Sequence, residues 1–124
     1  MRSSDRASLA EIEDFVEKTV AVVAAEEGLE PTLEQTFVLE PLELDAALIG
    51  VLERAAIATG ASLRRMASGA GHDAMVIGRH VPAAMLFIPS RGGISHSPAE
   101  HSSPDDVELG MRVLAGALRE LLSS

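Results

Sequence analysis

Residues 68–100 read SGAGHDAMVIGRHVPAAMLFIPSRGGISHSPAE and hold three of the four histidines and three of the six prolines of the chain. Their centre, residues 83–88, is a short and wholly apolar run that ends at Pro89. Such a run is typical of a strand buried on both faces. A glycine-containing turn with a histidine lies on each side of it, GAGHD at 69–73 and GGISHSP at 92–98. Because open α/β sheets place their sites in loops at the carboxyl ends of buried strands, this arrangement predicts two loops of an active site.

Composition limits what the chain can be. Its 124 residues fit one domain, and a hydrophobic content of 47% argues against disorder. The net charge of -9 argues against nucleic acid or an anionic membrane as a partner. Without cysteine there is no disulfide framework, thiolate zinc site or cysteine nucleophile. No signal-peptide core and no run as long as a membrane span is present, so we expect a cytoplasmic protein.

Apolar periodicity and turn residues predict a mixed α/β chain. Helices are expected from Asp5 to Gly28, from Asp45 to Gly60, over one or two turns within 72–79, and from Ser103 almost to the C-terminus, the last with an apolar stripe at Val107, Met111, Leu114, Leu118 and Leu121. Strands are expected over 32–40, 63–67 and 83–88. The composition of the sequence changes at Pro41, which predicts a domain boundary there. Because about 40 residues are few for an independent domain, the first segment is expected to be part of a larger unit.

His96 is the strongest candidate for chemistry, because its small neighbours do not mark it as a core residue. A loop histidine that only makes a hydrogen bond is the open alternative. A metal site without cysteine needs three or four histidines and carboxylates. The nearby candidates are His72, Asp73, His96, Glu100 and His101. They form no H-x-x-H or H-E-x-x-H pair, no G-x-S-x-G elbow is present, and the local set is too small for a complete site.

Three motifs together resemble the C-terminal signature of a metallo-amidohydrolase family. They are SGAGHDA at 68–74, PAAMLFIPS at 82–90 and GGISHSPAE at 92–100. The family is the M20-type group that contains N-carbamoyl-L-amino acid hydrolases, allantoate amidohydrolases and related hydantoin-utilisation enzymes. At the start of the chain, Met1-Arg2 resembles the family's D-(apolar)-R strand end, with the Asp absent.

The resemblance implies a two-domain subunit with an α/β catalytic domain and an inserted ferredoxin-like lid domain that forms a homodimer. Residues 1–41 would be the end of the lid, and residues 42–124 the C-terminal part of the metallopeptidase-like catalytic domain. Two divalent ions, zinc or manganese, would be the cofactors. The substrate would be a small N-carbamoyl amino acid or ureido acid.

A functional role known in the family is assigned here only to a residue that matches the family's motif. His96 corresponds to the last metal ligand, and Gly71 to a backbone position that contacts substrate. Arg2 corresponds to the lid arginine that grips the substrate carboxylate, a task suited to a bidentate guanidinium. His72 and Asp73 belong to the motif and are given only a supporting role behind the metal ligands.

The family's other metal ligands and its general-base glutamate lie upstream of the lid arginine, and this sequence lacks them. The chain is therefore expected to carry one metal ligand and no catalytic residue, and to be inactive alone. Two alternatives stay open. One is a non-catalytic dimerisation or binding remnant of that family. The other is part of an M20-type peptidase or aminoacylase.

Overall fold

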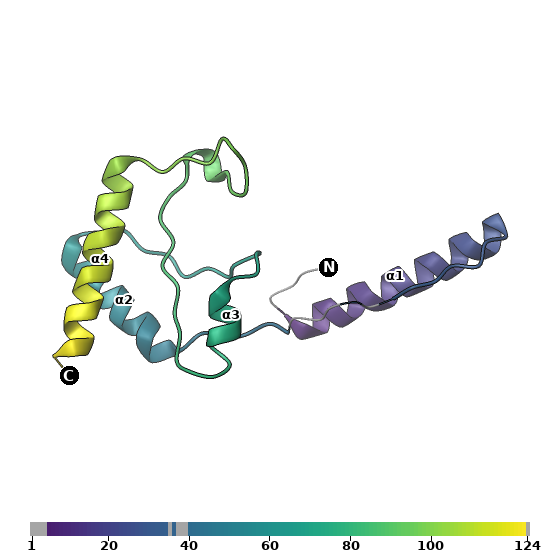
Figure 1. Cartoon of the computed structure of the whole chain (residues 1–124), viewed down its shortest axis with the longest axis horizontal. Helices are drawn as coiled ribbons and strands as arrows, with labels where there is room; N and C mark the ends of the chain where they lie inside the picture. The colour runs from purple at the N-terminus through teal and green to yellow at the C-terminus, as the bar shows by residue number, and fades with distance from the viewer. Residues whose placement is uncertain (1–4, 35, 37–39, 124) are drawn as a thin grey trace. The chain divides into compact units, whose positions relative to one another are not determined.

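The computed structural model describes residues 5–34, 36 and 40–123. Its elements are α1 (Arg6–Glu27), α2 (Ala46–Thr59), α3 (Asp73–Ile77), the 3-10 turn η1 (Arg91–Gly93) and α4 (Pro104–Leu122) (Figure 1). The chain divides into two compact units. The first contains the part up to Glu43 together with Ala67–Gly71, and the second contains Leu44–Met66 and His72–Ser124. The assignment of residues 1–41 to a lid domain stays a prediction.

The predicted helix boundaries of the first unit are confirmed by its capping contacts. Asp5 precedes α1, and its carboxylate accepts a 2.7 Å hydrogen bond from the backbone N–H of Ser8. This contact satisfies a donor that the first turn leaves unpaired, and it lowers the pKa of Asp5. Gly28 ends the helix with a left-handed φ of 65°. The only described residue of α1 that is buried is Ala24, so most of its apolar stripe is solvent-accessible.

Helices α2 and α4 form the core of the second unit. The carboxylate of Asp45 accepts from the N–H of Leu48, and the hydroxyl of Ser103 accepts from the N–H of Asp106, so both helices begin at the predicted caps. Their facing side chains are small and form one buried cluster: Val51, Ala55, Ala56, Val113 and Ala117. A Cβ at Gly116 would lie 3.3 Å from the Cβ of Ala55, so glycine permits this close helix crossing.

The apolar run at 83–88 lies against this helix pair. The carbonyl of Ala83 accepts a 2.9 Å hydrogen bond from the N–H of Asp45, just before α2. At its other end, Ile88 packs on α4, where a Cβ at Gly110 would come within 2.5 Å of the Ile88 Cγ2. Figure 1 shows the run as an uncoiled green trace between α3 and η1. These two contacts hold residues 83–88 against one side of the α2/α4 pair.

Residues 61–66 follow α2, and an ion pair holds this segment against the helix. Arg65 donates two hydrogen bonds to the Glu53 carboxylate, at 2.6 Å from Nε and 2.7 Å from Nη2. These charge-assisted bonds lower the pKa of Glu53. Because both side chains are solvent-accessible, the ion pair contributes little to stability and mainly sets the path of the segment.

The predicted strands are not formed in the described part of the chain. Residues 63–67 and 83–88 are non-helical and have no strand pairing, and the predicted strand over 32–40 falls partly outside the described residues. The physical reason is that a strand is defined by hydrogen bonds to a neighbouring strand, and a lone run has no such neighbour. The expected α/β architecture is therefore not confirmed by these residues, whose regular structure is helical.

The apolar side chains that a sheet would cover are instead exposed. Phe87 is 47% exposed, and the predicted stripe of α4 is 40% to 66% exposed along its whole length. Large uncovered apolar patches drive association. We expect the purified chain to self-associate or to be partly disordered, as measured by light scattering and amide hydrogen exchange. A monomer with one sharp two-state unfolding transition would contradict this expectation.

No described helix combines the length and the apolar character that a membrane-spanning segment requires. This finding agrees with the absence of a long apolar run in the sequence.

Candidate functional site

The loop over residues 90–101, which contains the GGISHSP sequence, is closed by hydrogen bonds within the loop. The N–H of Arg91 donates to the carbonyl of His101 at 2.8 Å, which joins the two ends of the loop. The Ser90 hydroxyl donates to the carbonyl of Ile94 at 2.6 Å. Gly92 and Gly93 both have positive φ, at 65° and 69°, and they reverse the chain before Ile94. The loop is therefore shaped by local contacts.

His96 lies at the exposed tip of this loop in an unusual backbone conformation. Its φ is 56°, and it is the only described non-glycine residue with a positive φ. The left-handed conformation costs an ordinary residue about 1 kcal/mol. The backbone N–H of His96 donates a 2.8 Å hydrogen bond to the carboxylate of Glu100, which fixes the turn. The side chain is exposed. Strain of this kind gathers at functional positions, which favours a role for His96 beyond the ordinary loop histidine.

His72 and Asp73 lie at the start of α3 in the same unit. His72 is the residue before the helix, and Asp73 occupies its first turn. The imidazole of His72 meets the ring of Phe87 edge-on, with ring centroids 5.6 Å apart and an interplanar angle of 61°. This contact holds His72 against the apolar run within the second unit. The supporting role of His72 and Asp73 stays a prediction. In the described part of the chain, no hydrogen bond or ring contact joins His96 to His72 or Asp73.

Gly71 belongs to the other unit, and its surroundings are open. A Cβ built on Gly71 would meet nothing within 4 Å, so these residues leave room for a ligand at its backbone. The preceding turn is fixed by Ser68, whose hydroxyl accepts from the N–H of Ala70 at 3.2 Å and donates to the carbonyl of the same residue at 3.0 Å. Arg2, the predicted carboxylate-binding residue, lies outside the described residues.

Two contacts of the site were not predicted from the sequence. The apolar run predicts Phe87 only as a core residue, yet its ring contacts the imidazole of His72. Glu100 was considered as a metal ligand, whereas its carboxylate accepts the backbone N–H of His96.

The described residues do not form a complete metal site. Across residues 5–34, 36 and 40–123, no group of three or more histidines and carboxylates is placed to hold an ion. His96 presents an exposed imidazole, and one histidine cannot complete a site that needs three or four ligands; its role as a metal ligand stays a prediction.

We expect the purified chain to bind zinc weakly and without defined stoichiometry, because a single histidine cannot hold the ion. Elemental analysis after dialysis measures this directly. One or two tightly held ions per chain would contradict the expectation and would mean that the chain folds around a site absent from this structure.

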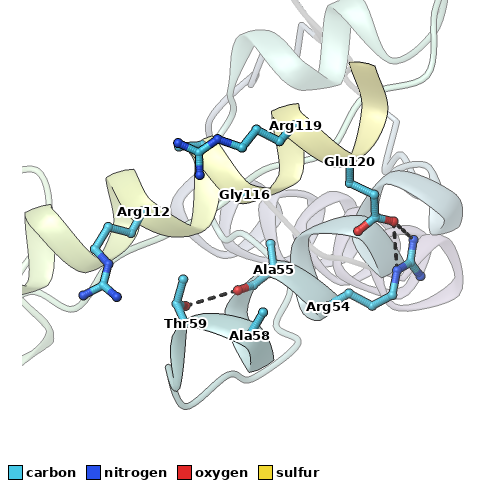
Figure 2. Close-up of a pocket in the computed structure, with 9 residues that line it drawn as sticks. Arg54, Ala55, Ala58, Thr59, Arg112, Gly116, Arg119 and Glu120 are labelled. Atoms are coloured by element: carbon cyan, nitrogen blue, oxygen red, sulfur yellow. Dashed lines mark hydrogen bonds and ion pairs between the residues drawn. The ribbon is translucent and has the colours of Figure 1, made fainter. Parts of the chain in front are cut away.

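A groove of about 510 Å³ lies elsewhere, between α2 and α4, and contains none of the predicted site residues. Figure 2 shows it, with Arg112 and Arg119 from α4 and an ion pair between Arg54 and Glu120 across the helices. The Arg54 Nε donates to the Glu120 carboxylate at 2.9 Å. The remaining lining residues are Ala55, Ala58, Thr59, Ala115 and Gly116. The groove follows from small residues at the helix crossing and is separate from the His96 loop.

Comparison with known proteins places these motifs in a family. The model of the peptidase family M20/M25/M40 matches residues 11–120. The chain is 40% identical over 113 residues to an allantoate amidohydrolase of Bacillus subtilis (strain 168). The aligned stretch covers 89% of this chain and 27% of that protein. It is 33% identical over 121 residues to an N-carbamoyl-L-amino-acid amidohydrolase of Paenarthrobacter aurescens, with 98% of this chain and 29% of the relative covered.

A solved structure agrees with the sequence relatives. The crystal structure of an amidase of the hydantoinase/carbamoylase family from Burkholderia vietnamiensis superposes with a TM-score of 0.87 at 38% identity, over 92% of this chain and 28% of that one. The chain therefore spans between a quarter and a third of the length of the relatives it matches. With a family match over almost its whole length, the chain belongs to the peptidase family M20/M25/M40.

Proposed function

We propose that the chain is the C-terminal part of a metal-dependent amidohydrolase that cleaves linear C–N amide bonds of N-carbamoyl amino acids or of ureido acids such as allantoate. In this proposal the catalytic domain is an α/β domain, the subunit forms a homodimer through a lid, and the enzyme is cytoplasmic. The isolated chain is inactive. It contributes substrate-binding and metal-binding side chains to a site that needs residues from the rest of the enzyme.

The strained His96 loop is the observation that carries the proposal. The loop is closed by its own hydrogen bonds and presents one exposed imidazole from a left-handed backbone. It lies within a chain that is similar to amidohydrolases of two substrate types, allantoate and N-carbamoyl-L-amino acids. The loop sequence GGISHSPAE also resembles part of the signature of the amidohydrolase family.

Each proposed role matches a chemical capacity of the residue. His96 would supply a neutral nitrogen to one of two divalent ions, zinc or manganese, whose other ligands would come from the rest of the enzyme. Arg2 holds the substrate carboxylate with two parallel hydrogen bonds. Gly71 lets the substrate approach the backbone, because no side chain occupies that position. His72, whose ring contacts Phe87, and Asp73, in the first turn of α3, have a supporting role behind the metal ligands.

Two other functions remain as outcomes to test. The family name itself includes peptidases, so a peptidase or aminoacylase is the nearest alternative. A non-catalytic dimerisation or binding remnant of the family is the other.

A substrate panel separates these functions. The chain is fused behind the upstream part of the Burkholderia vietnamiensis amidase, loaded with zinc or manganese, and assayed with N-carbamoyl-L-amino acids, allantoate, N-acetyl amino acids and dipeptides. We expect turnover of the first two classes. Preferred cleavage of dipeptides or N-acetyl amino acids would identify the peptidase or aminoacylase alternative. A folded, metal-loaded fusion that cleaves none of the four would support the non-catalytic remnant.

A further inference from the structure

The backbone at the tip of the His96 loop needs a constraint to keep its conformation. His96 has a φ of 56°, which brings the Cβ of a non-glycine residue close to the carbonyl oxygen that follows it. Such a conformation persists only where the surrounding contacts enforce it. Residues 91–100 are all solvent-exposed, so packing against a core does not supply the constraint. The hydrogen bonds within the loop are therefore the contacts that can hold His96.

A tight turn directly after His96 brings Glu100 back toward it. The N–H of Glu100 donates to the carbonyl of Ser97 at 2.9 Å, which closes a β-turn over residues 97–100. Pro98 occupies the second position of this turn, where the fixed φ of proline is favoured. The hydroxyl of Ser97 also accepts the N–H of Ala99 at 3.2 Å. The turn is thus fixed by its own residues, and it places the Glu100 side chain beside His96.

The carboxylate of Glu100 completes the constraint. Its Oε2 accepts a 2.8 Å hydrogen bond from the N–H of His96. A charged acceptor makes this bond stronger than one between neutral groups. In the part of the chain that the structure describes, the carboxylate makes no other hydrogen bond or ion pair. Because the bond fixes the peptide plane that precedes the Cα of His96, it also fixes the direction of the Cα–Cβ bond.

We propose that Glu100 is a positioning residue for His96, whose carboxylate holds the left-handed backbone and so sets the direction in which the imidazole leaves the loop. The inference rests on the proposed function, in which this imidazole binds a metal ion. Loss of a partner that orients a metal ligand typically lowers metal affinity or activity by about 10- to 100-fold. A comparable loss is expected when Glu100 no longer holds His96.

A direct bond from Glu100 to the metal is the competing role. A ligand carboxylate needs its negative charge, whereas a positioning residue needs only an acceptor for the N–H of His96. Glutamine has the same side-chain length and a carbonyl oxygen that accepts a hydrogen bond, but it is neutral. Glu100→Gln therefore separates the two roles, and Glu100→Ala removes both.

The first test measures zinc affinity by chelator competition in the chain fused behind the upstream part of the Burkholderia vietnamiensis amidase. Glu100→Ala is expected to weaken affinity by about 10- to 100-fold. Glu100→Gln is expected to recover about half of that loss on a logarithmic scale, because a neutral hydrogen bond is about half as strong as a charge-assisted one. Equal losses for alanine and glutamine would identify Glu100 as a ligand and overturn the proposal, as would unchanged affinity in Glu100→Ala.

Glu108→Ala is the matched control. Glu108 is an exposed carboxylate of α4 outside the loop, and its replacement changes the net charge by the same one unit. This variant is expected to leave zinc affinity unchanged. A loss equal to that of Glu100→Ala would show that general charge, and not the bond to His96, determines affinity.

The second test needs no metal. Amide hydrogen exchange at the N–H of His96 is measured by NMR in the metal-free fusion. Glu100→Ala is expected to speed this exchange by about tenfold, because the donor loses its acceptor. Glu100→Gln is expected to lie between the wild type and Glu100→Ala. Unchanged exchange in Glu100→Ala would show that the carboxylate does not hold the backbone, and would overturn the proposal.

Pro98 tests whether the turn acts through Glu100. Pro98→Ala makes the turn less rigid and is expected to weaken zinc affinity by about two- to fivefold. In the Glu100→Ala background the same change is expected to have no further effect, because the turn then carries no acceptor for His96. Additive losses in this double-mutant cycle would contradict the proposed coupling.

These results are distinguishable from the test of the proposed function. A fusion that binds zinc through His96, depends on Glu100 as described and cleaves no carbamoyl or ureido substrate would refute the proposed function and leave the positioning role intact. An active fusion that loses zinc on His96→Ala but not on Glu100→Ala would leave the function intact and refute the positioning role.

Discussion

Replacing His96 by alanine in the fused enzyme is expected to abolish metal occupancy and turnover together. Loss of a residue behind a metal ligand lowers metal affinity or activity by about 10- to 100-fold, so loss of a ligand is expected to cost at least about 100-fold. The two measurements are metal content after dialysis and kcat/KM for an N-carbamoyl-L-amino acid. A variant that keeps its metal and loses only activity would show that His96 acts on the substrate instead.

The left-handed backbone of His96 requires a second variant. Alanine tolerates a φ of 56° poorly, so His96→Ala changes both the imidazole and the strain of the loop. Asparagine adopts this conformation more readily and lacks the imidazole, so His96→Asn isolates the loss of the ligand. Both variants are expected to lose metal equally. His80→Ala, at an exposed histidine outside the motifs, serves as the control and is expected to keep metal and activity.

Replacing Arg2 by alanine in the fused enzyme is expected to lower kcat/KM by about 30- to 1000-fold without loss of metal. Charge-assisted hydrogen bonds to the substrate carboxylate contribute about 2–4 kcal/mol when water is excluded. Each loss of about 1.4 kcal/mol lowers kcat/KM by a factor of about ten. Initial rates over a range of substrate concentrations, together with metal analysis, provide both quantities.

A substrate without the carboxylate is the control for Arg2. The loss of kcat/KM for an amide analogue that lacks this group is expected to be much smaller, because the variant removes no interaction with it. Arg2→Lys keeps the charge and loses the bidentate geometry, so it is expected to fall between the wild type and Arg2→Ala. Equal losses for both substrates would show that Arg2 has a structural role.

The helices were predictable because their signals are local. Asp45 and Ser103 cap their helices through contacts three residues along the chain, and Gly28 ends α1 with a left-handed backbone. Such contacts need no distant partner, so sequence spacing alone indicates them. The strands were not confirmed for the opposite reason. The apolar run at 83–88 is typical of a buried strand, but a strand exists only beside a neighbour, and the described residues provide none.

The motifs indicate candidate residues and not their geometry. The sequence singles out His96 as a candidate, and that role stays a prediction, whereas its positive φ and the hydrogen bond from its N–H to Glu100 depend on how the loop closes. The contact of His72 with Phe87 joins residues 15 positions apart in the sequence, and neither side chain alone indicates the other. The roles of Arg2 and Gly71 stay predictions, because they depend on a substrate and on parts of the enzyme beyond these residues.

The rate of ammonia release from N-carbamoyl-L-amino acids and allantoate, with and without the upstream polypeptide, tests the central claim most directly. The account predicts no release above background by the chain alone, with zinc or manganese present, and catalytic turnover once the upstream polypeptide is joined to it. Turnover by the isolated chain, or a folded and metal-loaded fusion that releases no ammonia from either substrate, would contradict it.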